Sequence, residues 1–145
     1  MKTIIEYSLK ATSHPELERK KIRSSNDAEL VLRSFFYDDI IIYESFFILM
    51  LNRTNTVTGW AKISQGGVVG TVVDPKIIAK YIADTMASGI ILCHNHPSGN
   101  KTPSQSDIDI TKKINSMVKY FDCKVFDHII LTETDYYSFA DNGDL

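Results

Sequence analysis

The sequence predicts an α/β or α+β domain in which a mostly central sheet is sandwiched by helices. Segments with strand periodicity and segments with helix periodicity are interleaved along the chain, a pattern typical of this layered class. With 145 residues and 43% hydrophobic content, the chain has room for one domain with its own core and not for two. We expect residues 1–24 to form an N-terminal extension, packed or flexible, and residues 25–145 to form the domain.

The first helix is predicted to follow this polar extension. Within residues 1–24, only the apolar residues between Ile4 and Leu9 alternate as a short strand would. Asn26 followed three positions later by Glu29 is a helix-start pattern, and the helix should continue to about Tyr37.

Strands are predicted next, beginning with residues 40–51. This run is rich in strand formers and almost continuously apolar, as in a strand buried on both faces. Residues 52–55 resemble a hairpin loop that returns into a strand at 57–63. A Gly-Gly turn then leads into the apolar residues 68–73.

A second helix should begin at Asp74-Pro75, because Asp is a good N-cap and Pro suits the first turn. Gly89 is placed to end it. Its apolar residues recur at helical spacing, which indicates core packing; they are Ile77, Ile78, Tyr81, Ile82 and Met86.

The next strand, at residues 90–93, should deliver His94 and His96 at its end, followed by an irregular loop at 97–100. A third helix is predicted with Thr102 as its N-cap and Pro103 at its first position. Its core-facing stripe comprises Ile110, Ile114, Met117, Val118 and Phe121.

Residues 125–131 form the last clear predicted strand, and the tail at 132–145 is polar apart from a few aromatic residues. The strand carries His128. A histidine in an apolar strand is usually a core residue with its hydrogen bonds satisfied. We favour this interpretation and keep as the alternative a role in supporting a metal ligand or contacting the substrate.

The pair His94 and His96, together with Asp107, predicts a metal site. Alternate side chains of a strand share a face, so the two imidazoles can hold one ion. Asp107 continues the core-facing stripe of the third helix toward its N-terminus, which directs it to the same place. Two imidazoles and one carboxylate leave a fourth position on Zn²⁺ for water, as in catalytic sites.

Hydrolysis by a metal-activated water also needs a proton acceptor and a group that stabilises the oxyanion. Glu44 interrupts the apolar run at 40–51, and a carboxylate there is costly unless it is paired or functional. A solvent-facing glutamate at a strand edge is the alternative. Ser104 lies one turn before Asp107 and is the candidate oxyanion donor, against the alternative of a simple helix-start serine. These parts together describe metal-assisted hydrolysis of an amide.

The same residues carry a family resemblance. His94-Asn95-His96-Pro97, six residues, Ser104, two residues and Asp107 match the pattern H-x-H-P-x6-S-x-x-D of the JAMM metalloproteases, also called JAB or MPN+. The fuller text H-N-H-P-S-G-N-K-T-P-S-Q-S-D, with D-H-I-I-L at 127–131, resembles the bacterial RadC-like branch. The resemblance extends from about residue 25 to the C-terminus.

This resemblance implies a cytidine-deaminase-like fold, in three α/β/α layers with a mixed central sheet. It also implies one Zn²⁺ per chain held by His94, His96 and Asp107, with Glu44 as general acid/base and Ser104 as oxyanion stabiliser. Full-length RadC-like proteins usually add a helix-hairpin-helix region of a type that binds DNA, and we expect this chain to be too short to include one.

Composition limits the kinds of binding partner and the cellular compartment that we expect. The formal net charge of −2 gives no field that attracts a polyanion, which argues against nucleic acid. No apolar run approaches a membrane span and no signal peptide is recognisable, so we expect a cytoplasmic protein. Cys93 and Cys123 lie thirty residues apart in apolar surroundings and are interpreted as reduced core thiols.

We therefore expect a zinc-dependent peptidase or isopeptidase acting on a peptide or protein substrate of unknown identity, with homo-oligomer formation left open. Two alternatives remain: a RadC-like protein associated with DNA repair or nucleic-acid processing, and a non-catalytic MPN-type interaction module. A TIM-barrel hydrolase with the same H-x-H would need about 250 residues and is excluded by length.

Overall fold

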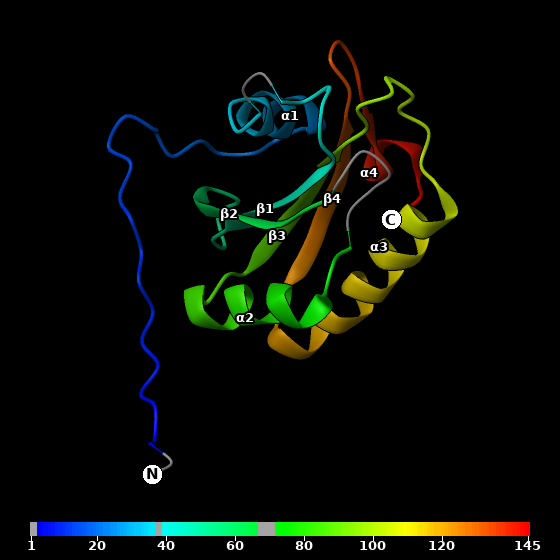
Figure 1. Cartoon of the computed structure of the whole chain (residues 1–145). Helices are drawn as coiled ribbons and strands as arrows, with labels where there is room; N and C mark the ends of the chain where they lie inside the picture. The colour runs from blue at the N-terminus through cyan, green and yellow to red at the C-terminus, as the bar shows by residue number, and fades with distance from the viewer. Residues whose placement is uncertain (1–2, 37–38, 67–71) are drawn as a thin grey trace.

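A mixed five-stranded sheet forms the centre of the computed structural model, which describes residues 3–36, 39–66 and 72–145 (Figure 1). The strands lie in the order β2-β1-β3-β4-β5. β3 and β4 are parallel, and the other neighbours are antiparallel. Their bounds are β1 Ser45–Leu51, β2 Val57–Gln65, β3 Gly89–Asn95, β4 Lys124–Leu131 and β5 Tyr136–Ser138. The prediction of a mixed central sheet is confirmed.

Helices cover both faces of this sheet, which gives the three predicted layers (Figure 1). Alternate residues of β1 belong to two separate core clusters, because successive side chains of a strand point to opposite faces. α1 packs over the cluster that contains Leu49, and α2 and α3 pack over the cluster that contains Ile48. The helices are α1 Ser25–Arg33, α2 Pro75–Thr85, α3 Gln105–Val118 and the short η1 Lys119–Phe121 and α4 Phe139–Asn142.

The N-terminus of α1 differs from the prediction. Its N-cap is Ser24, whose side chain accepts a hydrogen bond from the Asp27 amide, and the Asp27 carboxylate accepts one from the Arg23 amide at 2.8 Å. Asn26 is therefore inside the helix. Its predicted partner Glu29 pairs instead with a residue one turn later, Arg33. The prediction failed because two overlapping capping patterns lie in this segment.

The predicted strand at 40–51 is too long at its start. Residues 39–42 form turns, in which the Ile42 amide donates to the Asp39 carbonyl at 2.9 Å, and β1 begins only at Ser45. Ile41 and Ile42 are exposed, at 52% and 47%. Hydrophobic character alone could not distinguish these residues from the buried strand that follows. The predicted end of the first helix at Tyr37 lies outside the described residues, and α1 ends at Arg33.

Two further boundaries are corrected around α2. The helix begins as predicted, with Asp74 as N-cap, but it ends at Met86, which has φ = +54° and an exposed side chain rather than a place in the core. Gly89 opens β3 instead; a Cβ there would lie 2.2 Å from the Phe126 ring, so only glycine permits this approach. Most of the apolar run at 68–73 lies outside the described residues, and its end, at 72–73, is not in a strand.

The tail contains structure that the sequence pattern did not indicate. β5 and α4 fold back on β4, and the buried carboxylate of Asp127 holds them there. It accepts hydrogen bonds from the Ser138 hydroxyl at 2.6 Å and from the amides of His128 and Ala140 at 2.7 and 3.0 Å. Burial raises the pKa of Asp127, although these hydrogen bonds oppose the rise.

Residues 3–19 extend from the domain (Figure 1). Their apolar side chains are exposed. The chain joins the domain where Lys21 pairs with Thr56 and the Val57 amide donates to the Lys20 carbonyl at 2.8 Å. The division at residue 24 stays a prediction. Cys93 and Cys123 are free and buried, as predicted. Among the described residues, no helix has the length and apolar character needed to cross a membrane.

Replacing Asp127 tests how the tail is held. Asp127→Ala leaves three donors unpaired, which should lower the free energy of unfolding by about 1–3 kcal/mol for each donor that stays buried. Asp127→Asn should keep most of that free energy. Because the folded-state pKa of Asp127 is raised, its contribution is present at acid pH and is lost as pH rises through that pKa. Denaturant unfolding at several pH values should therefore show wild type losing stability relative to Asp127→Asn as pH rises; the opposite slope would contradict the assignment.

Candidate metal centre

Two histidines from the end of β3 face each other. β3 lies in the middle of the sheet and all seven of its residues are buried. His94 lies within the strand and His96 one residue beyond its end, and their Nε2 atoms are 2.9 Å apart. The expectation that the two side chains share one side is confirmed. On the far side of the His96 ring, Nδ1 lies 2.6 Å from the Asn100 carbonyl, which fixes the ring.

Two carboxylates converge on the same nitrogens. Asp107 Oδ1 lies 3.2 Å from His94 Nε2, and Asp107 Oδ2 lies 3.3 Å from His96 Nε2. Glu44 Oε1 lies 3.9 Å from both nitrogens. Glu44, His94 and His96 form a group whose ligand atoms all lie within 4.8 Å of one another and could hold a metal ion. Either carboxylate could therefore be the third ligand. Asp107 is the closer of the two to both rings.

The electrostatics of this cluster favour a cation at its centre. Burial would raise the pKa of Asp107, but its contacts with His94 and His96 hold that pKa far below the usual range, so the carboxylate is ionised. Burial would lower the pKa of His96, yet Asp107 and the Asn100 carbonyl raise it above its ordinary value. Imidazole nitrogens and carboxylate oxygens are the ligands that Zn²⁺ takes in catalytic sites, so these residues fit the ion.

Asp107 is positioned by the start of α3. The N-cap is Ser104, not the predicted Thr102, and Ser104 and Asp107 form a reciprocal capping box. The Ser104 Oγ accepts from the Asp107 amide at 3.1 Å, and the Asp107 Oδ2 accepts from the Ser104 amide at 2.8 Å. The same carboxylate therefore caps the helix and faces the histidines. Ser104 itself is exposed rather than part of the core-facing stripe, and its Oγ lies at the helix end beside the site.

Glu44 is positioned by a residue that the sequence reasoning passed over. Asn95 is fully buried between the two histidines and points to the other side of β3. Its Oδ1 accepts from the Ser45 amide at 2.8 Å, and its Nδ2 donates to the carbonyls of Ile40 and Tyr43 at 2.6 Å each. The segment that carries Glu44 is thus tied to the strand that carries the histidines. A polar amide inside an apolar strand was the available signal.

His128 also belongs to this site, although the sequence favoured a core residue. It is fully buried, and its Nε2 lies 2.8 Å from His94 Nδ1. Its Nδ1 lies 2.6 Å from the Thr111 hydroxyl. Both readings hold, because the ring is buried and satisfied and yet touches a candidate metal ligand.

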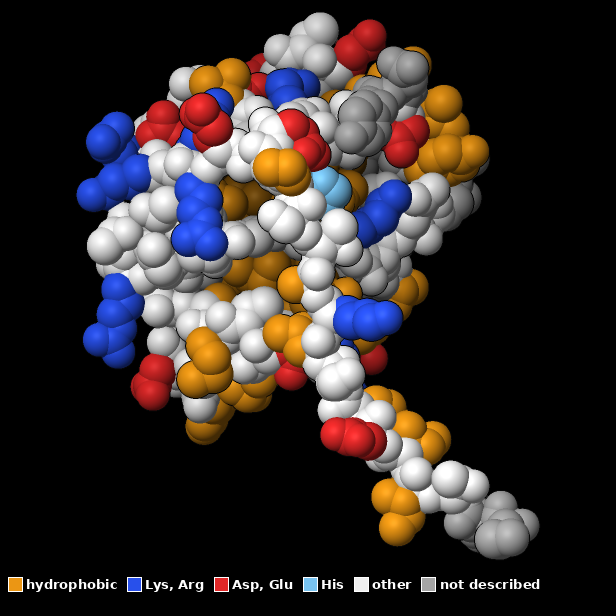
Figure 2. All heavy atoms as spheres, turned by 90° about the vertical axis from the view of Figure 1, so that its left-hand side faces the viewer, with side chains coloured by type: hydrophobic (Ala, Val, Ile, Leu, Met, Phe, Trp, Pro, Cys, Tyr) orange, Lys and Arg blue, Asp and Glu red, His pale blue; other side chains and the backbone are white. Residues whose placement is uncertain are grey.

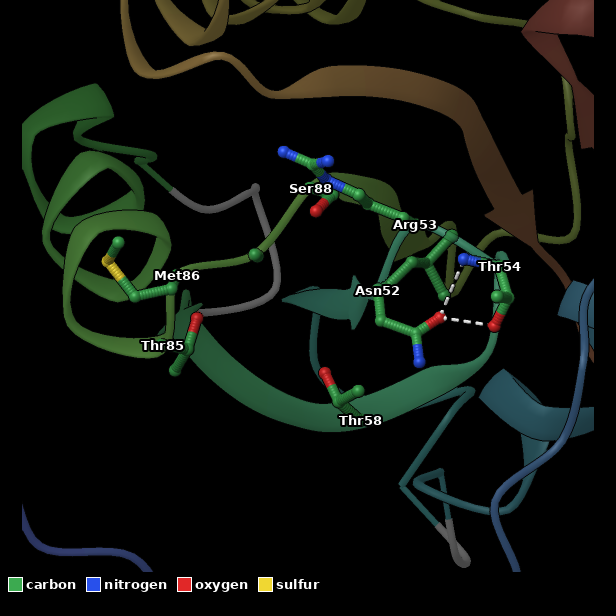
Figure 3. Close-up of a pocket in the computed structure, with 9 residues that line it drawn as sticks. Asn52, Arg53, Thr54, Thr58, Thr85, Met86 and Ser88 are labelled. Carbon is green, nitrogen blue, oxygen red and sulfur yellow. Dashed lines mark hydrogen bonds between the residues drawn. The ribbon is translucent and has the colours of Figure 1, made fainter.

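A pocket of about 350 Å³ lies at the other end of β1, as Figure 3 shows. It is lined by the β1–β2 hairpin, including Arg53 and Thr54, and by the end of α2 around Met86. Leu51, one of its lining residues, comes seven positions after Glu44 along β1, a distance of roughly 20 Å. None of its lining residues is a histidine or a carboxylate, so it is not part of the metal centre.

Comparisons with known proteins match most of the chain to one family. Residues 22–144 match the family described as RadC-like JAB domain. A UPF0758 protein of Flavobacterium johnsoniae is 42% identical over 96% of this chain and 60% of its own length. UPF0758 proteins of Syntrophomonas wolfei and Porphyromonas gingivalis are each 32% identical, over 99% and 96% of this chain and 61% of their own lengths. The chain thus spans about 60% of the length of these relatives.

Replacing Asn95 tests how the site is held together. Asn95→Leu removes three hydrogen bonds and should lower the free energy of unfolding by about 1–3 kcal/mol for each group left buried and unpaired. The Ser45 amide should also exchange with solvent faster, relative to a core amide such as Leu92. Asn52→Leu is the matched control, because the Asn52 side chain makes three hydrogen bonds in the hairpin at the far end of β1. Unchanged relative exchange at Ser45 in Asn95→Leu would contradict this role.

Proposed function

This chain belongs to the RadC-like JAB domain family, and from that membership and the cluster around His94 we propose that it is a zinc-dependent hydrolase of peptide or isopeptide bonds. The observation that carries the proposal is the convergence of His94, His96, Asp107 and Glu44 on one point at the end of a buried strand. A site with three protein ligands needs only one carboxylate beside the two ring nitrogens. The second carboxylate is then available for proton transfer.

We assign the ligand set to His94, His96 and Asp107. The contacts of Asp107 with the two rings, at 3.2 and 3.3 Å, are shorter than those of Glu44 at 3.9 Å. The capping box also holds Asp107 from both ends, which suits a fixed ligand. Zinc bound there supplies a water whose pKa is lowered toward neutrality and polarises a carbonyl oxygen.

Glu44 then acts as the general acid/base. Its Oε1 is equidistant from the two ring nitrogens, so it faces the centre of the ligand set. Its side chain is only 17% exposed, which places the carboxylate near the reacting atoms and away from bulk water. A carboxylate in this position accepts the proton of the attacking water and returns it to the leaving amine.

Ser104 supplies the oxyanion donor in this proposal. Its Oγ uses a lone pair to accept from the Asp107 amide, so the hydroxyl proton can still be donated. Its exposure leaves it accessible to a substrate carbonyl. A donor of this kind contributes about 3 kcal/mol to stabilisation of the transition state.

The substrate class follows from the chemistry of the site and from the charge of the chain. On the face shown in Figure 2, Lys and Arg side chains are scattered among acidic ones instead of forming one continuous patch. This distribution and the net charge of −2 favour a peptide or protein substrate over nucleic acid. Free, buried cysteines are in keeping with the reducing cytoplasm, which is where we place the protein.

Replacing the proposed base tests this function. Glu44→Gln should keep zinc affinity within a few-fold and lower kcat by about 100-fold or more, because it removes the proton acceptor and leaves the ligands in place. The assay is a time course on peptides and isopeptide-linked conjugates, with and without chelator. Glu18→Gln is the control, because this glutamate is exposed in the N-terminal segment that extends from the domain. Full activity in Glu44→Gln would refute the assignment. Metal binding without turnover by wild type would favour an interaction module, and activity confined to nucleic acid would favour a nucleic-acid-processing role.

A further inference from the structure

We propose that Thr111 and His128 form a buried positioning relay that sets which nitrogen of His94 carries its proton, so that the Nε2 lone pair faces the metal centre. The inference rests on the proposed zinc site and extends it to two residues without contact to the metal position. It starts from three contacts in series: Thr111 with the Asp107 carbonyl, Thr111 with His128, and His128 with His94.

The direction of the first hydrogen bond is fixed by chemistry. The Thr111 Oγ lies 2.6 Å from the Asp107 carbonyl oxygen, and a carbonyl can only accept. A hydroxyl has one proton, so Thr111 donates its only hydrogen bond to the Asp107 carbonyl. The second contact, 2.6 Å from Thr111 Oγ to His128 Nδ1, must then be donated by the ring. His128 therefore carries a proton on Nδ1.

Burial determines the state of the other His128 nitrogen. The ring is fully buried, stacked on Phe139 with centroids 4.7 Å apart and packed edge-on against Phe46 at 5.5 Å. A second proton would place a cation between these aromatic rings, at the high cost of an unpaired buried charge. His128 is neutral, and its Nε2 is an acceptor.

The third contact then sets His94. His128 Nε2 lies 2.8 Å from His94 Nδ1, so His94 must donate through Nδ1. A neutral His94 with its proton on Nδ1 presents a bare lone pair on Nε2. The Nδ1 proton of His96 is placed by a shorter route, because its Nδ1 donates to the Asn100 carbonyl. In both rings Nε2 is then the nitrogen left to bind a cation, and the two Nε2 atoms lie 2.9 Å apart.

The choice of histidine as the outer partner has a chemical consequence. Ligating histidines commonly donate their second N–H to a carboxylate, a carbonyl or water. A carboxylate at position 128 would add a third carboxyl group to the cluster, and its negative charge would weaken the Lewis acidity of a divalent ion. A neutral imidazole fixes the same tautomer without adding charge. The relay also runs through the first turns of α3, so one helix both places Asp107 and orients His94.

Nitrogen-15 NMR of the imidazole rings in the zinc-free full-length chain tests the relay directly, because protonated and bare ring nitrogens differ widely in chemical shift. We expect Nδ1 to carry a proton in both His94 and His128, and Nε2 of His128 to be bare. A bare Nδ1 on His94, or a proton on Nε2 of His128, would overturn the proposal. This measurement needs neither zinc nor turnover. Its result is therefore independent of whether the protein hydrolyses peptide or isopeptide bonds.

Zinc affinity, measured by chelator competition, provides the second readout. His128→Leu should weaken zinc binding 10- to 100-fold, the range typical when an outer partner of a ligand is lost. His128→Gln, which keeps an acceptor for His94, should recover most of that loss, and Thr111→Val should give a smaller loss than His128→Leu. Ile129→Ala is the control for destabilisation, because Ile129 is equally buried but packs on the other face of the sheet. Equal zinc affinity in His128→Leu and Ile129→Ala would refute the relay.

Discussion

Burial of β3 is the constraint on which the rest of the site depends. The strand lies between β1 and β4 with all seven residues buried, and it ends in consecutive polar side chains. Buried polar groups must find hydrogen-bond partners or incur a large desolvation cost. His94 turns to one side of the sheet and meets His128 and Asp107, while Asn95 turns to the other and binds the segment before β1. Satisfying these groups therefore assembles the candidate metal centre from three distant parts of the chain.

The same contacts divide the carboxylates into two kinds. Asp107 is held by the capping box of α3 and lies 3.2 and 3.3 Å from the two rings. Glu44 follows a turn segment that Asn95 ties to β3, and it lies 3.9 Å from both rings. The nearer carboxylate suits a ligand, and the more distant one suits proton transfer. The ionised Asp107 also gives the cluster a negative charge that a divalent cation would balance. The proposed division of roles rests on how each acid is placed relative to the two rings.

Most of the sheet, and the three residues closest to one another in the cluster, could be predicted from local patterns. Strand alternation placed His94 and His96 on one side, and helical spacing directed Asp107 toward them. The prediction errors lie where two capping patterns overlap and where apolar residues are not in a strand. Ser104 rather than Thr102 caps α3 because Asp107 is the residue that completes the box. Residues 40–43 are apolar yet form turns and loop, which hydrophobicity cannot reveal.

Residues that act through tertiary contacts were beyond the reach of the sequence. Asn95 acts on carbonyls more than fifty positions away, and His128 acts on a ring thirty-four positions away. Nothing in their immediate neighbours specifies those partners. The binding of β5 and α4 to Asp127 is of the same kind, since one buried carboxylate gathers a polar tail that has no strong pattern of its own.

The measurement that tests the central claim most directly is the zinc content of the full-length chain after loading with zinc and removal of loosely bound metal by gel filtration. We predict close to one zinc per chain for wild type and for Asp109→Ala, in which an exposed acid of the same helix is removed. Asp107→Ala should retain little or none. Absence of zinc from wild type, or equal retention by Asp107→Ala and Asp109→Ala, would contradict the metal centre described here.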